Sequence, residues 1–283
     1  MSRILVFGRT GQVAYELQCL APVASLDRSA VDLSSPDSCA AAIHANAPSV
    51  VINAAAYTAV DRAEDEEALA TQINGNAPAA MAQACAQRNI PLLHLSTDYV
   101  FAGSGKQAWT PSAATKPINA YGRSKLAGEL AIRNSGAKHI ILRTSWVFSA
   151  HGSNFVKTML RLAESHPVLR VVSDQHGGPT SARSLARALL QLPDIVQDGV
   201  DGGTYHFAGA PATTWSDFAR AIFSDADLNN QVIDITSDQY PTPAARPANS
   251  VLDCTSLTTD FGIEPPNWRA DLRTTLKDLG ATS

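Results

Sequence analysis

The sequence has few cysteines, and their spacing excludes a disulfide framework or a zinc ribbon. Only four occur in 283 residues, and no two of them form a C-x-x-C pair. Small disulfide-rich domains and structural zinc sites need closely spaced cysteines. We therefore expect the thiols to be reduced, as is usual in the cytoplasm. They belong to Cys19, Cys39, Cys85 and Cys254.

Long apolar runs are also missing. The first apolar run ends where Arg9 interrupts it, which is too short for a signal peptide. The longest uncharged stretch, residues 68–87, contains several amide side chains that a bilayer would have to bury. We therefore expect no signal peptide, no membrane span and a cytoplasmic location.

The sequence has no surplus of positive charge. Lys and Arg number 22 and Asp and Glu number 26, which gives a net charge of −4. Proteins that neutralise a phosphate backbone usually carry a basic surplus, so nucleic acid is not an expected partner. Apolar residues make up 45% of the chain, which is enough for a sizeable core and excludes a disordered protein.

What the first half does contain is an alternation of apolar runs and helical patterns. Short runs that read as strands buried on both faces lie at residues 4–7, 50–52, 91–95 and 139–142. Helical segments lie between and after them, at residues 11–21, 37–46, 76–89 and 119–133. This order predicts an α/β fold with a doubly wound parallel sheet of the Rossmann type.

After about residue 147 proline and glycine become denser, and the expected elements become shorter. Residues 169–172 and 205–207 still read as strands. We expect residues 1–147 to form the main domain and residues 148–283 to form mainly a smaller C-terminal lobe. Some segments of residues 168–210 are expected to return to the main sheet.

A glycine-rich turn follows the first predicted strand. Gly8, Gly11 and Ala14 stand in G-x-x-G-x-x-A spacing at the start of a helix. Such glycines allow a tight turn and let backbone amides approach a pyrophosphate, which the helix N-terminus also attracts. The pattern predicts a dinucleotide site, although an ordinary glycine turn has the same spacing. The residues assigned to it are Gly8, Thr10, Gly11, Gln12 and Val13.

The adenosine end of the cofactor is predicted near the second strand. Asp27 lies about 20 residues after the turn, where a carboxylate would hold the ribose 2′-hydroxyl of NADH. Arg9 and Arg28 would instead receive the 2′-phosphate of NADPH. The sequence therefore points both ways, and both cofactors stay open. Further cofactor contacts are assigned to Asp32, Leu33, Ala54, Ala55, Ala56 and Thr58.

An acidic cluster at residues 61–67 follows these alanines. Thr58 and Asp61 fit a capping box, and we interpret the cluster as compensation of a helix dipole on a solvated face. It is not expected to hold a metal. The histidines offer no H-x-x-x-H pair either, and His94 and His139 read as strand residues.

Tyr121 and Lys125 stand four residues apart in the segment predicted as a helix, so they share one helix face. A lysine charge would lower the pKa of tyrosine from about 10, and the phenol would then donate a proton to a carbonyl oxygen as hydride reaches the carbon. Thr97, at the end of a strand, is placed to polarise that carbonyl. An exposed helix and a strand-end hydroxyl are the alternative interpretations.

These segments together resemble the extended short-chain dehydrogenase/reductases. Within that family they are most similar to members that reduce a keto sugar nucleotide. The resemblance implies reduction of the C4 ketone of dTDP-4-dehydro-β-L-rhamnose to dTDP-L-rhamnose by NADPH, with NADH as an alternative. The segments that carry it include residues 8–13 (GRTGQV), 53–61 (NAAAYTAVD), 96–101 (STDYVF), 121–129 (YGRSKLAGE) and 143–147 (RTSWV).

The resemblance also implies roles for individual side chains. Tyr121 would be the proton donor, and Lys125 would hold the nicotinamide ribose and tune Tyr121. Thr97 would orient the substrate carbonyl, while Asp98 and Trp146 would border the sugar.

Two residues of the second half keep two interpretations each. Asn154 either caps a following helix or binds substrate. Arg246 either contacts the substrate diphosphate or forms a surface salt bridge. Some family members hold Mg²⁺ at a dimer contact lined by glutamates. Glu16 stands at one such position but Arg183 at another, so Mg²⁺ is not expected here, while a homodimer stays open.

Two other classes of protein share these features. A non-catalytic regulatory subunit of the same fold would bind a nucleotide without needing both Tyr121 and Lys125. A sugar-nucleotide epimerase or dehydratase also uses a Y-x-x-x-K pair, but a dehydratase typically has a glutamate beside the aspartate. Here Tyr99 follows Asp98, so the reductase is the favoured prediction.

Overall fold

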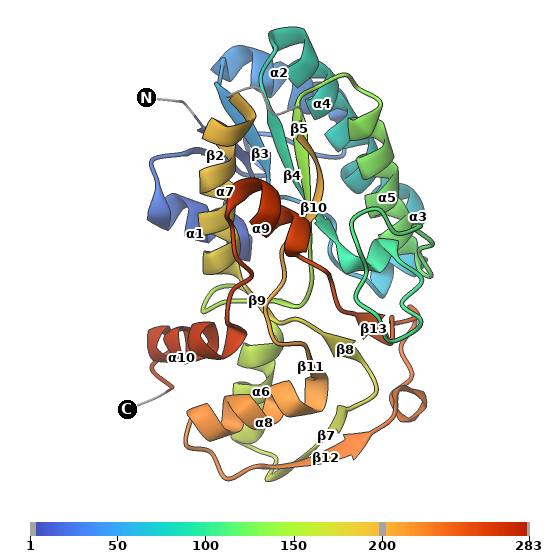
Figure 1. The fold of residues 1–283 in the computed structure, drawn as a ribbon, viewed down its shortest axis with the longest axis vertical. Helices are drawn as coiled ribbons and strands as arrows, with labels where there is room; N and C mark the ends of the chain where they lie inside the picture. The colour runs from blue at the N-terminus through green and yellow to red at the C-terminus, as the bar shows by residue number, and fades with distance from the viewer. Residues whose placement is uncertain (1–3, 198–201, 282–283) are drawn as a thin grey trace.

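The computed structural model describes residues 4–197 and 202–281. Its largest element is a six-stranded parallel sheet in the order β10-β5-β4-β3-β1-β2 (Figure 1). The predicted doubly wound α/β fold is therefore confirmed. The strands are β1 (Ile4–Phe7), β2 (Ala24–Leu26), β3 (Val50–Asn53), β4 (Leu92–Thr97), β5 (His139–Thr144) and β10 (Gly202–His206).

Helices cover both faces of this sheet, which explains why its strands are apolar throughout. In β1, Val6 points into one core cluster while Leu5 and Phe7 point into the other, because successive strand residues face opposite sides. One face packs against α1 (Gln12–Leu20), α7 (Ala182–Gln197) and α9 (Thr255–Phe261). The other packs against α2 (Pro36–Asn46), α4 (Ala77–Arg88) and α5 (Ala120–Arg133).

The acidic segment after β3 does not form the expected capped helical turn. It forms a 3-10 turn, η1 (Arg62–Glu64), then α3 (Glu67–Thr71) and a π-helical turn, η2 (Gln72–Asn76), that runs into α4. Asp61 precedes η1 without capping it. Its carboxylate instead accepts hydrogen bonds from the amide of Ala244 (3.1 Å) and from Arg246 (2.7 Å). The predicted capping box is wrong because a distant loop engages this side chain.

Much of the second half of the chain forms a smaller lobe at the carboxyl edge of the sheet (Figure 1). Its core contains Phe148, Phe218 and Trp268. The elements that precede β10 are β6 (Val147–Phe148), α6 (Phe155–Ala163), β7 (Val168–Val172), β8 (His176–Gly177) and β9 (Thr180–Ser181). Those that follow are β11 (Thr213–Thr214), α8 (Trp215–Asp225), β12 (Gln231–Ile235), η4 (Ser237–Gln239), β13 (Asn249–Ser250) and α10 (Trp268–Asp278).

Some segments of the second half belong to the main sheet. Strand β10 pairs with β5, and α7 packs on the face that α1 also covers. The expectation of short elements is wrong for α7, which has 16 residues and is the longest helix described. Among the described residues, no helix is long and apolar enough to cross a membrane.

Candidate active site

The glycine turn leaves backbone amides free at the start of α1. Gly8 has φ +113°, and a Cβ there would lie 3.3 Å from the carbonyl oxygen of Ala54. Gly11 is the N-cap of α1, and in the part of the chain described no side chain caps it and no acidic residue stands in the first turn. Thr10 and Gly11 are exposed. The turn therefore offers an open anion site of the kind that binds pyrophosphate.

Gln12 connects this turn to the second lobe. Its Oε1 accepts hydrogen bonds from the hydroxyl of Ser149 (2.9 Å) and from Nδ2 of Asn154 (2.9 Å). The Oδ1 of Asn154 caps α6 by accepting from the amide of Lys157 (3.2 Å). Asn154 therefore makes the contacts of a helix cap, as one of its two interpretations predicted. Val13, the next residue after Gln12, is buried.

Opposite charges meet where the adenosine end was predicted. The Asp27 carboxylate accepts from the hydroxyl and amide of Ser29, and these bonds hold its pKa below the ordinary value. Nη1 of Arg9 lies 3.4 Å from the same carboxylate. Asp32 accepts from the amide of Ser34 (2.8 Å) in an exposed turn, and Leu33 is half-buried beside it. This geometry keeps both cofactor alternatives open.

The loop after β3 is tied to α5 by a residue that sequence analysis missed. Asn74, buried in the π-helical turn η2, accepts from the amide of Tyr57 (2.8 Å) and donates to its carbonyl (2.9 Å). It also donates to the hydroxyl of Ser124 in α5 (2.9 Å). No motif identified Asn74, because its partners lie 17 and 50 residues away. In this loop Ala54, Ala55 and Ala56 are half-buried and Thr58 is exposed.

The start of α5 is fixed by contacts on three sides. Oδ1 of Asn119 accepts from the amide of Gly122 (2.8 Å), and Oε1 of Glu64 accepts from the amide of Ala120 (2.8 Å). A Cβ on Gly122 would lie 2.2 Å from the carbonyl oxygen of Tyr99. Glycine at this position therefore lets the first turn of α5 press against the segment that follows β4.

That contact brings Tyr121 to the end of β4. Its ring packs edge-on against Tyr99 with centroids 5.5 Å apart, and Thr97 lies close enough to its phenol to offset part of the pKa rise that burial causes. The Thr97 hydroxyl also donates to Oδ1 of Asp98 (3.1 Å). Burial raises the pKa of Tyr121 above its ordinary value. The structure thus brings the predicted residues Tyr121, Thr97 and Asp98 together at the end of β4, and the raised pKa of Tyr121 favours its protonated form.

Lys125 lies one helical turn further on but faces β4. Its Nζ donates to the carbonyl of Leu95 (2.7 Å) and lies 3.2 Å from Nε2 of His94. Burial lowers the pKa of Lys125 to about 8. The expectation that Lys125 lowers the pKa of Tyr121 is not met, because the lysine nitrogen is engaged by β4 and burial dominates at the phenol.

Asp98 is held by the second lobe. It is buried, and its Oδ2 accepts from the hydroxyl of Ser250 in β13 (2.5 Å). Burial raises the pKa of Asp98 to about 6. Ser250, 152 residues away, is thus a further side chain of the site that no local pattern indicated.

A buried ion pair supports the same helix. Glu129, one turn after Lys125, accepts from Nε and Nη2 of Arg143 (2.8 and 2.7 Å) and from the hydroxyl of Ser96 (2.6 Å). Burial raises the pKa of Glu129, but these bonds and Arg133 outweigh it and leave the pKa below its ordinary value. The pair joins α5 to β4 and β5.

Trp146 lies at the same edge of the sheet in a strained conformation. Thr144, two residues earlier, pairs in register with Thr97. Trp146 has φ +49°, which is an outlier for a bulky residue. Its ring stacks on Trp215 with centroids 3.6 Å apart, and a Cβ on Gly177 would lie 2.6 Å from the indole. Stacking on Trp215 therefore holds the indole in place, and glycine at position 177 leaves room for it.

Arg246 has the salt-bridge contacts that sequence analysis kept as an alternative. Nη2 lies 2.7 Å from Oδ2 of Asp61, and Nη1 donates to the carbonyl of Ala244 (3.1 Å). The guanidinium is therefore already engaged within the chain.

The residues around Glu16 do not fit a magnesium ion. Glu16 is buried, and Nε of Arg183 and Nε2 of His151 lie 3.8 and 3.6 Å from its carboxylate. Arg183 also pairs with Asp278 (3.3 Å). The Arg183 guanidinium is positively charged and would repel a cation next to Glu16. Within residues 4–197 and 202–281, no group of three or more His, Cys, Asp or Glu side chains could hold a metal ion.

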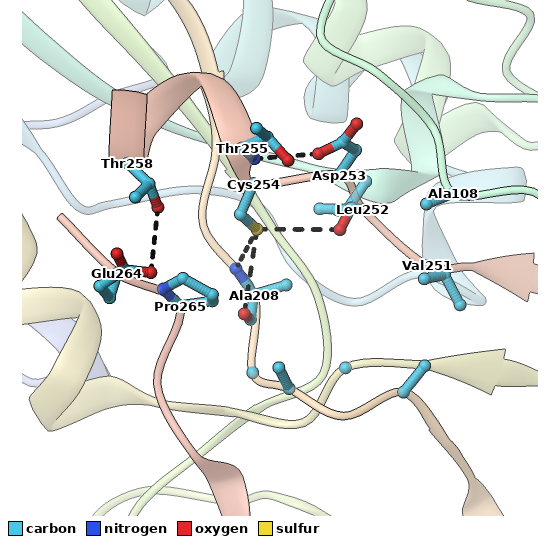
Figure 2. A pocket seen from close by; sticks show the side chains of 14 residues that line it. Ala108, Ala208, Val251, Leu252, Asp253, Cys254, Thr255, Thr258, Glu264 and Pro265 are labelled. Carbon is cyan, nitrogen blue, oxygen red and sulfur yellow. Dashed lines mark hydrogen bonds between the residues drawn. The ribbon is translucent and has the colours of Figure 1, made fainter. Parts of the chain in front are cut away.

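A cavity of about 430 Å³ is lined by other residues (Figure 2). None of the predicted site residues lines it. Two of its polar side chains already have partners, because Asp253 accepts from the amide of Thr255 (2.9 Å) and Glu264 from the hydroxyl of Thr258 (3.4 Å). We assign it no part in the site.

Comparison with known proteins identifies the family. Residues 1–281 match the family model described as RmlD substrate binding domain. The chain is 40% identical to the dTDP-4-dehydrorhamnose reductase of Escherichia coli (strain K12) over 301 residues, which cover 99% of each chain. It is 42% identical to that of Aggregatibacter actinomycetemcomitans over 288 residues, covering 96% of this chain and 98% of that one.

A solved structure agrees. The dTDP-4-dehydrorhamnose reductase of Bacillus anthracis, in complex with NADP, is 31% identical and superimposes with a TM-score of 0.93 over 98% of this chain and 99% of that one. The resemblance inferred from the motifs is thus confirmed, and this chain belongs to the dTDP-4-dehydrorhamnose reductase family.

Proposed function

We propose that this protein reduces the C4 ketone of dTDP-4-dehydro-β-L-rhamnose to dTDP-L-rhamnose by hydride transfer from NADPH. The observation that carries the proposal is that Tyr121, Thr97 and Asp98 lie together at the carboxyl end of β4. The chain is also similar along its whole length to dTDP-4-dehydrorhamnose reductases. The NADP in the Bacillus anthracis relative supports the choice of cofactor. NADH stays an alternative because Asp27 is present beside Arg9.

In this proposal the chain's own residues orient the ketone and deliver the proton. The bound nicotinamide supplies the hydride. Tyr121 donates its phenolic proton to the C4 oxygen, and its raised pKa keeps the phenol protonated at neutral pH. Thr97 donates a hydrogen bond to the same oxygen, and Lys125 holds the nicotinamide ribose. Asp98 and the fixed indole of Trp146 border the sugar.

We assign cofactor binding and substrate binding to different parts of the chain. Residues 1–147 bind the dinucleotide, with the exposed amides of the glycine turn at its pyrophosphate, and residues 148–283 mainly bind the sugar nucleotide. We favour the salt-bridge interpretation of Arg246, because Asp61 holds it. The unpaired cysteines support a reducing, cytoplasmic location. A homodimer stays a prediction, and the pairing of Arg183 with Glu16 argues against one bridged by Mg²⁺.

The test supplies the 4-keto sugar nucleotide and follows the loss of NADPH absorbance. We expect turnover by the wild-type protein and a loss of about 10²- to 10⁴-fold in kcat for Tyr121→Phe, with NADPH affinity unchanged. Tyr205→Phe is the matched control, because the Tyr205 hydroxyl donates to Oδ2 of Asp260 (3.1 Å), which is not a residue of the site.

Each contrary outcome has a distinct meaning. Absence of NADPH oxidation by the wild-type protein would support the regulatory-subunit alternative. Turnover only with another sugar nucleotide would indicate a different reductase or epimerase. Equal kcat values for Tyr121→Phe and wild type would exclude Tyr121 as the acid.

A further inference from the structure

Two tryptophans from distant parts of the chain stack on one another at the carboxyl edge of the sheet. Trp146 lies two residues after β5, and Trp215 is the first residue of α8. Their ring centroids lie 3.6 Å apart and their planes differ by 13°. Both residues are half-buried. The proposed function places Trp146 beside the sugar, whereas it gives Trp215 no role.

Several contacts fix the indole of Trp215. Thr214 caps α8, because its hydroxyl oxygen accepts from the amide of Asp217 (3.1 Å). The indole N–H of Trp215 donates to Oε1 of Gln175 (3.2 Å), and its ring packs against Phe155 with centroids 4.6 Å apart. The same side chain packs against the core of the second lobe. Trp215 therefore offers Trp146 a flat surface that is itself held in place.

The pairing of β8 with β11 explains why Trp215 reaches Trp146. In this antiparallel pair Thr213 lies opposite Gly177, two residues before Trp215. A Cβ on Gly177 would lie 2.6 Å from the indole of Trp146. The strand pair thus brings Trp215 next to the indole for which Gly177 leaves room.

Trp146 needs such support because its own backbone is strained. Its φ of +49° is unfavourable for a bulky residue, and conformations of this kind persist only where the surrounding structure fixes them. The carbonyl of Trp146 accepts from the amide of Thr180 (3.1 Å), which holds the backbone but not the ring. An aromatic ring that is fixed before the sugar arrives loses little side-chain freedom on binding.

We propose that Trp215 is a positioning residue, which holds the indole of Trp146 in the orientation that binds the sugar. The inference rests on the proposed function, because that function places Trp146 beside the sugar. Trp215 then affects recognition of the sugar, but it affects neither the transfer of hydride and proton nor the nucleotide half of the substrate. Gln175 contributes indirectly, because it orients Trp215 through the indole N–H.

The test compares Trp215→Leu with Trp215→Phe. Both variants keep an apolar side chain against Phe155 and the core, but only phenylalanine presents a flat ring to Trp146. For Trp215→Leu we expect KM for the 4-keto sugar nucleotide to rise about tenfold, with kcat and NADPH affinity within about threefold of the wild type. Trp215→Phe should keep KM within about threefold. An unchanged KM in Trp215→Leu, or a fall in kcat alone, would overturn the proposal.

Binding of dTDP separates the nucleotide from the sugar. Because dTDP has no sugar for Trp146 to contact, calorimetry should give the same dTDP affinity for Trp215→Leu and the wild type. A loss of dTDP affinity as large as the rise in KM would show a disturbance of the whole lobe and would contradict the proposal. Absence of turnover by the wild type contradicts the proposed function instead, so the two failures are distinguishable.

A double-mutant cycle tests whether Trp215 acts through Trp146. In the Trp146→Ala background, Trp215→Leu should raise KM less than about twofold further, because no indole is left to position. Losses that multiply in the double variant would show that Trp215 acts independently of Trp146, and a positioning role would then be wrong.

Gln175→Met provides a second variant, which keeps both indoles and leaves no cavity beside them. It removes the acceptor of the Trp215 N–H, so we expect KM to rise about threefold, the size of one hydrogen bond. If Trp215→Leu does not fold, an unchanged KM in Gln175→Met overturns the proposal.

Phe261→Leu is the matched control. Phe261, in α9, packs against Tyr205 with ring centroids 4.8 Å apart, and neither residue belongs to the site. The same kind of substitution there should leave KM for the sugar nucleotide unchanged. A rise as large as that of Trp215→Leu would show that KM responds to the loss of any aromatic contact and would contradict a specific role for Trp215.

Discussion

The carboxyl ends of β1 and β4 lie in one sheet but form their parts of the site by different means. After β1, the glycine turn presents helix amides, and the side chains add little. After β4, the working groups are buried side chains that distant segments hold, as Ser250 holds Asp98 and Arg143 holds Glu129. A site made of backbone depends on the absence of Cβ atoms. A site made of buried side chains depends on the pairing of charges, so the two ends should respond differently to substitution.

The largest effect is expected where a buried charge loses its partner. Glu129→Gln leaves the guanidinium of Arg143, itself 1% exposed, without a carboxylate. Breaking a buried pair from one side typically costs about 3–5 kcal/mol, so we expect the free energy of unfolding in urea to fall by this amount. Because Glu129 lies on the helix that carries Lys125, kcat should fall as well.

Glu67→Gln is the matched control, at another ion pair that involves α5. Glu67 pairs with Arg123 of α5 at 2.7 Å, but the two side chains are 43% and 45% exposed. Exposed pairs contribute about 0–1 kcal/mol, so the unfolding free energy should change little. Similar losses in the two variants would show that burial does not distinguish these pairs.

A smaller effect is expected from Asp98, and it depends on pH. Burial raises its pKa from 3.8 to about 6. The folded protein therefore keeps a proton that the unfolded chain releases between pH about 4 and 6. The stability contributed by this group is complete below pH about 4 and is lost as pH rises through about 6, at about 1.4 kcal/mol per unit or about 3 kcal/mol in all.

Asp98→Asn removes this titration while keeping the shape of the side chain. The difference in unfolding free energy between wild type and variant should therefore move by about 3 kcal/mol between pH 4 and pH 7, in favour of the variant at the higher pH. Urea unfolding at several pH values measures it. A constant difference, or one of opposite sign, would contradict a raised pKa at Asp98.

The same contrast explains what could be predicted from the sequence. The strands and the glycine turn were predictable because they are encoded by neighbouring residues: apolar runs for the two-sided sheet and G-x-x-G-x-x-A for the turn. Strand-end and helix-face rules predicted Thr97 and Tyr121 as residues of one site. The partners Ser250, Asn74 and Arg143 were not predictable, because they lie 152, 50 and 14 residues from the groups they hold.

The wrong expectations have the same origin. Asp61 has the spacing of a capping residue, yet its carboxylate contacts Ala244 and Arg246, 183 and 185 residues away. Lys125 has the spacing of a partner for Tyr121, yet its nitrogen donates to the carbonyl of Leu95 in β4. Local spacing determines which face a side chain occupies, and tertiary contacts determine what it binds there.

The smallest effect on stability is expected from Arg9, in the glycine turn after β1. Its side chain is 59% exposed and lies 3.4 Å from Asp27. If NADPH places its 2′-phosphate here, which is one of the two sequence alternatives, Arg9→Ala should weaken NADPH binding about tenfold, the size of one charge-assisted hydrogen bond. NADH carries no such phosphate, so its affinity should change less than about twofold. Fluorescence titration with both cofactors measures the ratio, and equal losses would place the phosphate elsewhere. The unfolding free energy should change by no more than about 1 kcal/mol, because the Arg9–Asp27 pair is exposed. Glu129→Gln should lower it much more.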